Sequence, residues 1–143
     1  MKIGFTAGAF DLCHAGHMLS FREAKKNCDL LVVALHNDPS MERSNKNKPI
    51  MSIEERRIIL EGIRYIDMIF EYETEEELMA LLTGETVDWM NPDIRFLGDD
   101  WNDKPFTGHE LNIPIHWIDR SHGYSSSELR KRIAAVHTKD SQK

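Results

Sequence analysis

Hydrophobic residues along the chain gather in short runs that alternate with longer amphipathic stretches. Five short, mainly apolar runs are typical of buried strands, at residues 2–7, 29–36, 67–72, 93–98 and 113–119. Four longer stretches carry apolar residues at helical spacing among charged ones, at residues 16–28, 52–65, 74–84 and 125–137. Strands that alternate with helices predict an α/β fold, in which a mostly parallel five-stranded sheet is covered by helices on both faces.

The second helical stretch shows the clearest start signal in the chain. Ser52 and Glu55 have the spacing of a capping box, and Ile59, Leu60 and Ile63 are expected to form its buried stripe. Three arginines of this region, Arg56, Arg57 and Arg64, are interpreted as surface charges. Residues 37–50 are polar and contain two prolines, which indicates a mobile loop. One domain is expected over residues 1–136, followed by a polar tail at 137–143.

Composition narrows the class of protein. The chain has 143 residues and a formal net charge of −6, which fits one domain and disfavours binding along nucleic acid, because phosphate contacts need Lys and Arg. No run is long and apolar enough to span a bilayer, and Asp11 comes too early for a secretion signal. Cys13 and Cys28 lie outside any CxxC pair, as expected of free thiols in a cytoplasmic protein.

Polar and small residues follow the ends of four predicted strands. The segments are "GAFDLCHAGH" (8–17), the loop holding Lys46 and Lys48, "GDDW" (98–101) and "RSHGYSSS" (120–127). Carboxyl ends of parallel strands share one edge of a sheet, so these segments are expected to meet there. The combined set of histidines, cations, acids and helix starts suits a nucleoside triphosphate with its magnesium ion.

Each piece has a physical reason to bind phosphate. Small residues at 7–9 let backbone N–H groups approach a phosphate, and His14 and His17 near a helix start can donate to its oxygens. Arg120 can donate twice to one phosphate, and loop lysines can close over it. Each piece also has an ordinary structural reading. A lone HxxH pair is often a surface accident, and Ser125 with Glu128 is first of all a helix cap.

The motifs resemble a known family. "GAFDLCHAGH" resembles the GxFDxxHxGH signature of the cytidylyltransferase branch of the HxGH nucleotidyltransferases, and "RSHGYSSSEL" resembles its RTxGISTS segment. "GDDW" and "RRIILEGIRYID" are similar to stretches of the glycerol-3-phosphate cytidylyltransferases. The resemblance covers residues 2 to about 134. It implies a single Rossmann-like domain, usually in a homodimer, that transfers CMP from CTP to a phosphorylated alcohol and releases pyrophosphate, with Mg²⁺ as cofactor.

The resemblance also assigns roles to residues. The catalytic group would comprise His14, His17, Arg120 and Lys46. The nucleotide-binding group would comprise Gly8, Ala9, Phe10, Asp11, Ala15, Gly16, Lys48, Arg64, Asp100, Ser121, His122, Gly123, Tyr124, Ser125, Ser126 and Ser127. Either Lys46 or Lys48 would contact phosphate, and no metal ligand is assigned.

The acceptor is left open by one departure from the family pattern. A lysine is expected near the start of the helix after the third strand, where this chain has Thr74 followed by Glu75–Glu77. Glycerol 3-phosphate is the first candidate, and the acidic run favours phosphoethanolamine or phosphocholine instead. An adenylyltransferase and a nucleotide-binding module without catalysis are the other hypotheses.

Overall fold

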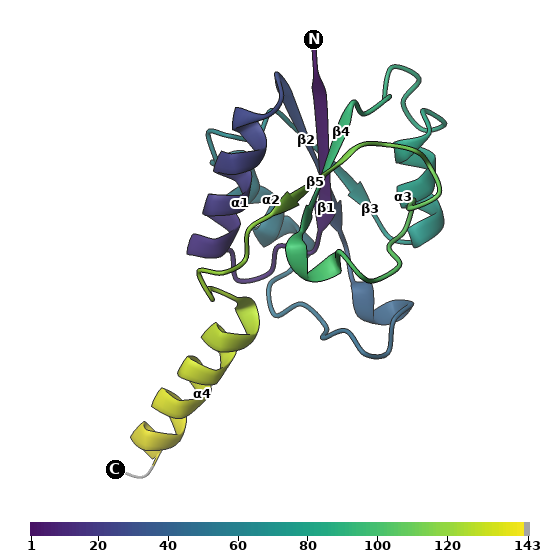
Figure 1. Ribbon diagram of the computed structural model, residues 1–143. Coiled ribbons are helices and arrows are strands. Elements are labelled where there is room, and N and C mark those ends of the chain that lie inside the picture. The colour runs from purple at the N-terminus through teal and green to yellow at the C-terminus, as the bar shows by residue number, and fades with distance from the viewer. Residues whose placement is uncertain (142–143) are drawn as a thin grey trace.

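The computed structural model describes residues 1–141 and contains five strands in one sheet (Figure 1). The strands are β1 (Ile3–Gly8), β2 (Leu30–His36), β3 (Met68–Tyr72), β4 (Ile94–Gly98) and β5 (Ile115–Ile118). Their order is β3-β2-β1-β4-β5, and all four pairings are parallel. The predicted α/β class is confirmed, and the sheet is wholly rather than mostly parallel.

Helices cover both faces of the sheet (Figure 1). The helices are α1 (Ala15–Lys26), α2 (Ile53–Glu61), α3 (Glu75–Leu82) and α4 (Ser126–Ser141), with short 3₁₀ turns η1 (Pro39–Met41) and η2 (Asp99–Trp101). One core cluster joins α1 and α2 to the sheet through Phe21, Leu60 and Leu31. The other core cluster joins α3 to the opposite face through Leu78 and Phe5. The two clusters make the single domain a three-layer structure.

The α2 helix begins where the sequence predicts, but the predicted stripe of buried residues is not fully buried. Ser52 and Glu55 form the capping box, and Leu60 is fully buried. Ile59, expected in the stripe, is 37% exposed. The helix ends at Glu61 before Gly62, so only a narrow face of its nine residues reaches the sheet.

The last helix, α4, extends away from the body of the domain (Figure 1). It runs to Ser141, so most of the segment expected as a polar tail is helical, and residues 142–143 lie outside the described part of the chain. Its first turns are tied to the domain by Arg130, whose Nη2 lies 3.0 Å from Asp11 Oδ2. Farther along, Ile133 and Val136 are exposed.

The strand order places a ligand crevice between β1 and β4. The chain winds from β1 outward to β3 on one side and from β4 to β5 on the other, so the direction of winding reverses at that pair. Ligands of open α/β sheets bind outside the carboxyl ends of the strands at such a reversal. Across residues 1–141, no helix combines the length and apolar character that crossing a membrane requires.

Candidate active site

A cavity of about 410 Å³ lies at the carboxyl ends of β1 and β4. Gly8 ends β1 and Gly98 ends β4, so the cavity occupies the crevice that the strand order indicates. Many of the predicted site residues line it, namely Gly8, Ala9, Phe10, His14, Gly16, His17, Lys46, Arg120, Tyr124, Ser125, Ser126 and Ser127. Four separate segments of the sequence therefore do meet at one edge.

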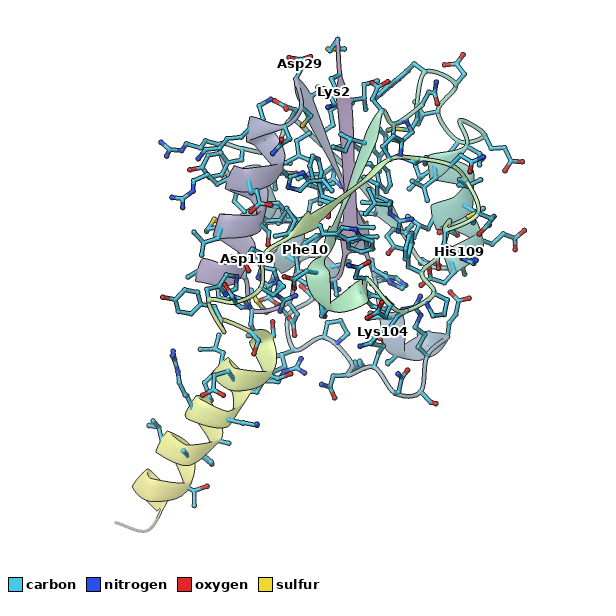
Figure 2. The ribbon with its side chains drawn as sticks, viewed as in Figure 1. Lys2, Phe10, Asp29, Lys104, His109 and Asp119 are labelled. Atoms are coloured by element: carbon cyan, nitrogen blue, oxygen red, sulfur yellow. The ribbon has the colours of Figure 1, made fainter. Side chains whose placement is uncertain are left out.

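The loop from β1 to α1 is tightly constrained. Phe10 and Leu12 both have φ of 50°, in the left-handed region that side chains seldom adopt. The Phe10 ring, labelled in Figure 2, is held between His17 and Phe21, with centroid separations of 5.6 and 5.1 Å. A Cβ on Gly16 would lie 2.8 Å from His14 Cε1 and 2.9 Å from the Tyr124 carbonyl. Glycine is therefore required where this loop meets the segment before α4.

The two histidines cap the first helix. His14 is the N-cap of α1, and its Nδ1 accepts a hydrogen bond from the Gly16 N–H at 3.0 Å. His17 Nδ1 accepts one from the His14 N–H at 3.2 Å. A ring nitrogen that accepts an N–H cannot carry a proton, so both neutral rings are protonated at Nε2. The capping box thus turns one N–H donor of each ring away from the backbone.

The surroundings keep both rings uncharged. Burial lowers the pKa of His17 to about 3, and the nearby His14 and Arg120 add to the effect. Burial also lowers the pKa of His14, together with Arg120 and His122. The ring centroids lie 4.1 Å apart, so a second positive charge there would be repelled. At neutral pH the site presents two neutral N–H donors beside a fixed cation.

The predicted second motif brings a helix start and a guanidinium to the cavity. Ser125 Oγ accepts the Glu128 N–H at 3.0 Å, which confirms the ordinary capping role of this serine. Ser126 Oγ donates to the Asp11 carbonyl at 3.1 Å and lies 3.3 Å from His14 Nε2. Arg120 lies 3.7 Å from Asp100 at the rim. The start of α4 and Arg120 therefore line one wall of the cavity with N–H donors, which are groups suited to an anion.

The loop before α2 contributes one lysine of the two proposed. Lys46 lines the cavity, and its Nζ lies 5.1 Å from the centre of the Trp101 ring. Arg43 and Lys104, the latter labelled in Figure 2, are each 6.0 Å from the same ring. Lys48 is exposed and lies outside the lining. Of the two lysines, Lys46 is the one that lines the cavity.

Asp11 does not line the cavity but holds together segments around it. Its carboxylate accepts the N–H groups of Ile50 and Met51 at 2.8 and 2.9 Å and pairs with Arg130. These hydrogen bonds and Arg130 hold the pKa of Asp11 below its ordinary value, although burial opposes them. Asp11 thereby connects the loop between β1 and α1 to the segment just before α2 and to α4.

Several other predicted residues also lie outside the cavity lining. The lining does not include Ala15, Asp100, Ser121, His122 and Gly123. His122 stacks on Tyr124 with a centroid separation of 5.1 Å, and its Nδ1 accepts the Tyr124 N–H. It therefore shapes the motif without lining the cavity.

The placement of Arg64 in the nucleotide site is wrong for this fold. Arg64 precedes β3, and the carboxyl ends of the parallel strands form the edge that carries the cavity. The residue therefore lies at the amino edge, the edge marked by Lys2 and Asp29 in Figure 2. There its guanidinium stacks 5.1 Å from the Tyr65 ring centre.

Arg56 is buried, not a surface charge as the amphipathic pattern suggested. It is 2% exposed and donates to the carbonyls of Ala9 at 3.0 Å and His36 at 2.6 Å. These carbonyls lie just beyond β1 and at the end of β2, so Arg56 fixes the loops that carry the site. The pattern could not reveal this, because charged residues of a short helix look alike in sequence.

Sequence reasoning also missed Arg95, at the second position of β4. It is 3% exposed and lines a second cavity beside the first. A charged residue inside the predicted buried strand at 93–98 was the signal available for it.

The carboxylates near the cavity are the side chains that could bind Mg²⁺. Among the side chains that the structure describes, residues 1–138, no group of three or more His, Cys, Asp and Glu could hold a metal ion. Mg²⁺ commonly uses one or two carboxylates together with substrate phosphates and water. Asp99 and Asp100 provide carboxylates in η2, beside Gly98. Their neighbours Gly98 and Trp101 line the cavity, so these carboxylates would be the protein ligands of a magnesium ion that arrived with a triphosphate.

Comparison with known proteins places the site in context. Residues 5–132 match the model of the cytidylyltransferase-like family. The chain is 33% identical over 137 residues to the bifunctional protein HldE of Helicobacter pylori, and 34% identical over 135 residues to that of Wolinella succinogenes. These matches cover 95% and 92% of the chain but 28% and 27% of the relatives. The chain thus spans little more than a quarter of the curated relatives.

Solved structures agree on the fold. A lipopolysaccharide core biosynthesis protein from Thermoplasma volcanium is 27% identical with a TM-score of 0.61, and the match covers 83% of this chain and 95% of that one. A pantothenate synthetase from Thermus thermophilus matches at 15% identity with a TM-score of 0.53, over 92% of this chain and 64% of that one. The second likeness concerns the fold alone.

Proposed function

Because the chain belongs to the cytidylyltransferase-like family, whose model covers residues 5–132, we propose that it transfers CMP from CTP to a small phosphorylated alcohol. sn-Glycerol 3-phosphate is the first candidate acceptor. The observation that carries the proposal is the pair of neutral Nε2–H donors of His14 and His17 in a cavity shared with Arg120 and Lys46. These groups suit a reaction that builds negative charge on phosphate oxygens.

The proposed reaction needs little covalent chemistry from the protein. An ionised phosphate oxygen of the acceptor forms a bond to the α-phosphorus of CTP, and the bond from that phosphorus to the β-bridging oxygen breaks. Pyrophosphate leaves with the electron pair, and the CDP-alcohol forms. The nucleophile is already deprotonated, so no general base is needed.

Catalysis then consists of positioning and charge stabilisation. The Nε2–H groups of His14 and His17 donate to oxygens on the α-phosphorus, while Arg120 and Lys46 offset the charge of the departing pyrophosphate. Magnesium bound to the triphosphate enters as part of the nucleotide substrate, and Asp99 or Asp100 would hold its protein-facing side. Backbone N–H groups at Gly8 and at the start of α4 complete the cradle.

CTP is proposed in preference to ATP because of the segment Arg120–Ser127. Its resemblance to the cytidylyltransferase branch, together with the Tyr124 and His122 stack at the cavity rim, favours a small pyrimidine over a purine. ATP remains the second candidate nucleotide, because the HxGH motif also serves adenylyltransferases.

Pyrophosphate release tests the proposal directly. Release would be measured for CTP, ATP, GTP and UTP against glycerol 3-phosphate, phosphoethanolamine and phosphocholine, with magnesium present. We expect the highest rate with CTP and glycerol 3-phosphate, and loss of that rate in a His14→Asn variant. Nucleotide binding without pyrophosphate release in any combination would instead favour a binding module without catalysis. Faster release with ATP would overturn the choice of nucleotide.

We also propose that the chain forms a homodimer, as the family resemblance implies. Light scattering of the purified protein is expected to give twice the mass of one chain at micromolar concentration. A monomer mass across the concentration range would contradict this proposal without affecting the proposed chemistry.

A further inference from the structure

A second cavity of about 280 Å³ opens beside the nucleotide cavity, on the α3 face of the sheet. The two cavities share lining residues at the end of β1 and in the loops above it, including Gly8, Lys46 and Trp101. Beyond that shared wall, the second cavity is lined by Arg43, Tyr72, Glu75, Arg95, Phe106 and Thr107. A molecule held there would lie next to a nucleotide in the first cavity.

Arg95 is the unusual group of this second cavity. Its Nη1 donates to the Thr107 carbonyl, and its guanidinium lies 5.3 Å from the Phe106 ring centre. Its Nε is buried without a hydrogen-bond partner, and Arg95 forms no ion pair with any described residue. A buried guanidinium with an unsatisfied donor is costly in free energy, so the group is poised for an oxygen atom from outside the chain.

The acidic run at the start of α3 does not make the second cavity negative. Glu75 is the acid among its described lining residues, and its charge is matched by Arg43 at 3.3 Å. Thr107 Oγ1 also donates to Glu75 Oε2 at 2.7 Å. Glu77 is turned back onto the Glu73 N–H at 2.6 Å, and Glu76 is exposed. With Glu75 and Arg43 balanced, Lys46 and Arg95 leave an excess of positive charge.

We propose that the second cavity holds the acceptor, and that Arg95 determines its class by binding oxygen atoms at the distal end of a phosphorylated polyol. This inference rests on the proposed nucleotidyl transfer. The acceptor phosphate lies at the shared wall near Lys46, where it faces the α-phosphorus, and the carbon chain extends toward Arg95. Hydroxyl oxygens there accept from the guanidinium, and hydroxyl hydrogens donate to Glu75.

The same charges disfavour the other acceptor classes. A trimethylammonium or ammonium head group would be repelled by the positive charges of Arg95 and Lys46. The carboxylate of Glu75 would attract it little, because Glu75 is already paired with Arg43. A distal carboxylate would satisfy Arg95 but would lie in the same small cavity as Glu75. A neutral polyol satisfies both the donor and the acceptor without adding charge.

The test compares Arg95→Met and Glu75→Gln with wild type, and uses Glu76→Gln as a matched control from the same helix turn. Initial rates would be measured with saturating CTP and varied glycerol 3-phosphate, phosphoethanolamine or 3-phosphoglycerate. For wild type we expect kcat/KM for glycerol 3-phosphate to exceed the other two at least tenfold. We expect Arg95→Met to raise KM for glycerol 3-phosphate at least tenfold, with the KM for CTP unchanged.

Glu75→Gln keeps the proposal testable if Arg95→Met fails to fold. Its amide oxygen can still accept from Thr107, so the variant is expected to fold, to raise the acceptor KM several-fold and to leave CTP-induced thermal stabilisation intact. Glu76→Gln is expected to match wild type. An unchanged acceptor KM in both cavity variants, or preference for either alternative acceptor, would overturn the inference while pyrophosphate release still supported the transfer. Absence of pyrophosphate release with every acceptor would overturn the proposed function itself.

Discussion

At the scale of single residues, His14 and His17 combine two roles that the sequence presents as alternatives. Each ring uses Nδ1 to cap the start of α1, and each thereby keeps its proton on Nε2. The structural role sets the tautomer that the proposed chemistry requires. The capping interpretation and the catalytic interpretation of the motif are therefore compatible.

This double role can be separated by substitution. Asn is a strong N-cap residue, so His14→Asn is expected to keep the helix start while losing the Nε2–H donor. We expect its turnover to fall roughly 10²-fold or more, with a change in unfolding free energy below about 1 kcal/mol. His14→Ala should lose similar turnover and a further ~1 kcal/mol of stability. Near wild-type turnover in His14→Asn, measured by pyrophosphate release, would remove His14 from the catalytic group.

The pKa of His17 predicts how stability depends on pH. The folded pKa of about 3 lies below the ordinary value of 6.5, so the unfolded chain binds a proton that the folded chain does not. The resulting stability is complete above about pH 6.5 and is lost as pH falls toward 3. In urea unfolding between pH 6 and 4, wild type is expected to lose up to about 1.4 kcal/mol per pH unit more than His17→Gln. Parallel pH profiles for the two proteins would contradict this assignment.

At the scale of elements, the loops after β1 and β2 are held by one side chain from α2. Arg56 reaches from the first turn of that helix to the carbonyls of Ala9, His36 and Asn37. The neighbouring Arg57 instead pairs with Glu61 and Glu71 at the surface. Of these two adjacent arginines, Arg56 therefore holds buried loops in place, whereas Arg57 forms ion pairs at the surface.

This contrast gives a matched pair of variants. Arg56→Met leaves buried carbonyls without a donor and is expected to lower the unfolding free energy by about 3 kcal/mol. Arg57→Met removes exposed ion pairs and is expected to cost less than about 1 kcal/mol. Urea denaturation measures both. A similar cost for the two variants would mean that water replaces the Arg56 hydrogen bonds.

At the scale of the whole molecule, the reversal of winding between β1 and β4 places two cavities side by side at one edge of the sheet. Segments from both halves of the sheet line the first cavity, and the second cavity adds residues of α3 and the segment around Thr107. Binding of a nucleotide therefore links segments from both halves and should stabilise the folded chain as a unit.

Ligand-linked stability tests the preference for a nucleotide. At a concentration one hundred times its Kd, a nucleotide adds about 2.7 kcal/mol to the free energy of unfolding. With equal concentrations of magnesium-bound CTP and ATP, we expect the larger rise in melting temperature with CTP. Lys46→Met should reduce the rise with CTP, and Lys48→Met should leave it unchanged, because only Lys46 of this pair lines the cavity. A larger rise with ATP would contradict the proposed nucleotide.

Local sequence patterns were enough to predict the succession of strands and helices along the chain, the α/β class and the edge at which the polar segments meet. These features follow from local causes: runs of apolar residues, caps such as Ser52 with Glu55, and the rule that parallel strands share their carboxyl edge. The cavity accordingly contains His14, His17, Arg120 and Ser125, which local motifs had indicated.

The positions of the charged residues relative to that edge could not be predicted from local patterns and depend on how the chain packs. Arg56, Arg64 and Arg95 look alike in the sequence, yet they support the site loops, lie at the opposite edge and line the second cavity, respectively. The structure likewise distinguishes the two loop lysines, because Lys46 lines the cavity and Lys48 does not. The reason is physical: a long cationic side chain carries no periodic signal of its own, and its partners are set by strand order and by residues distant in sequence.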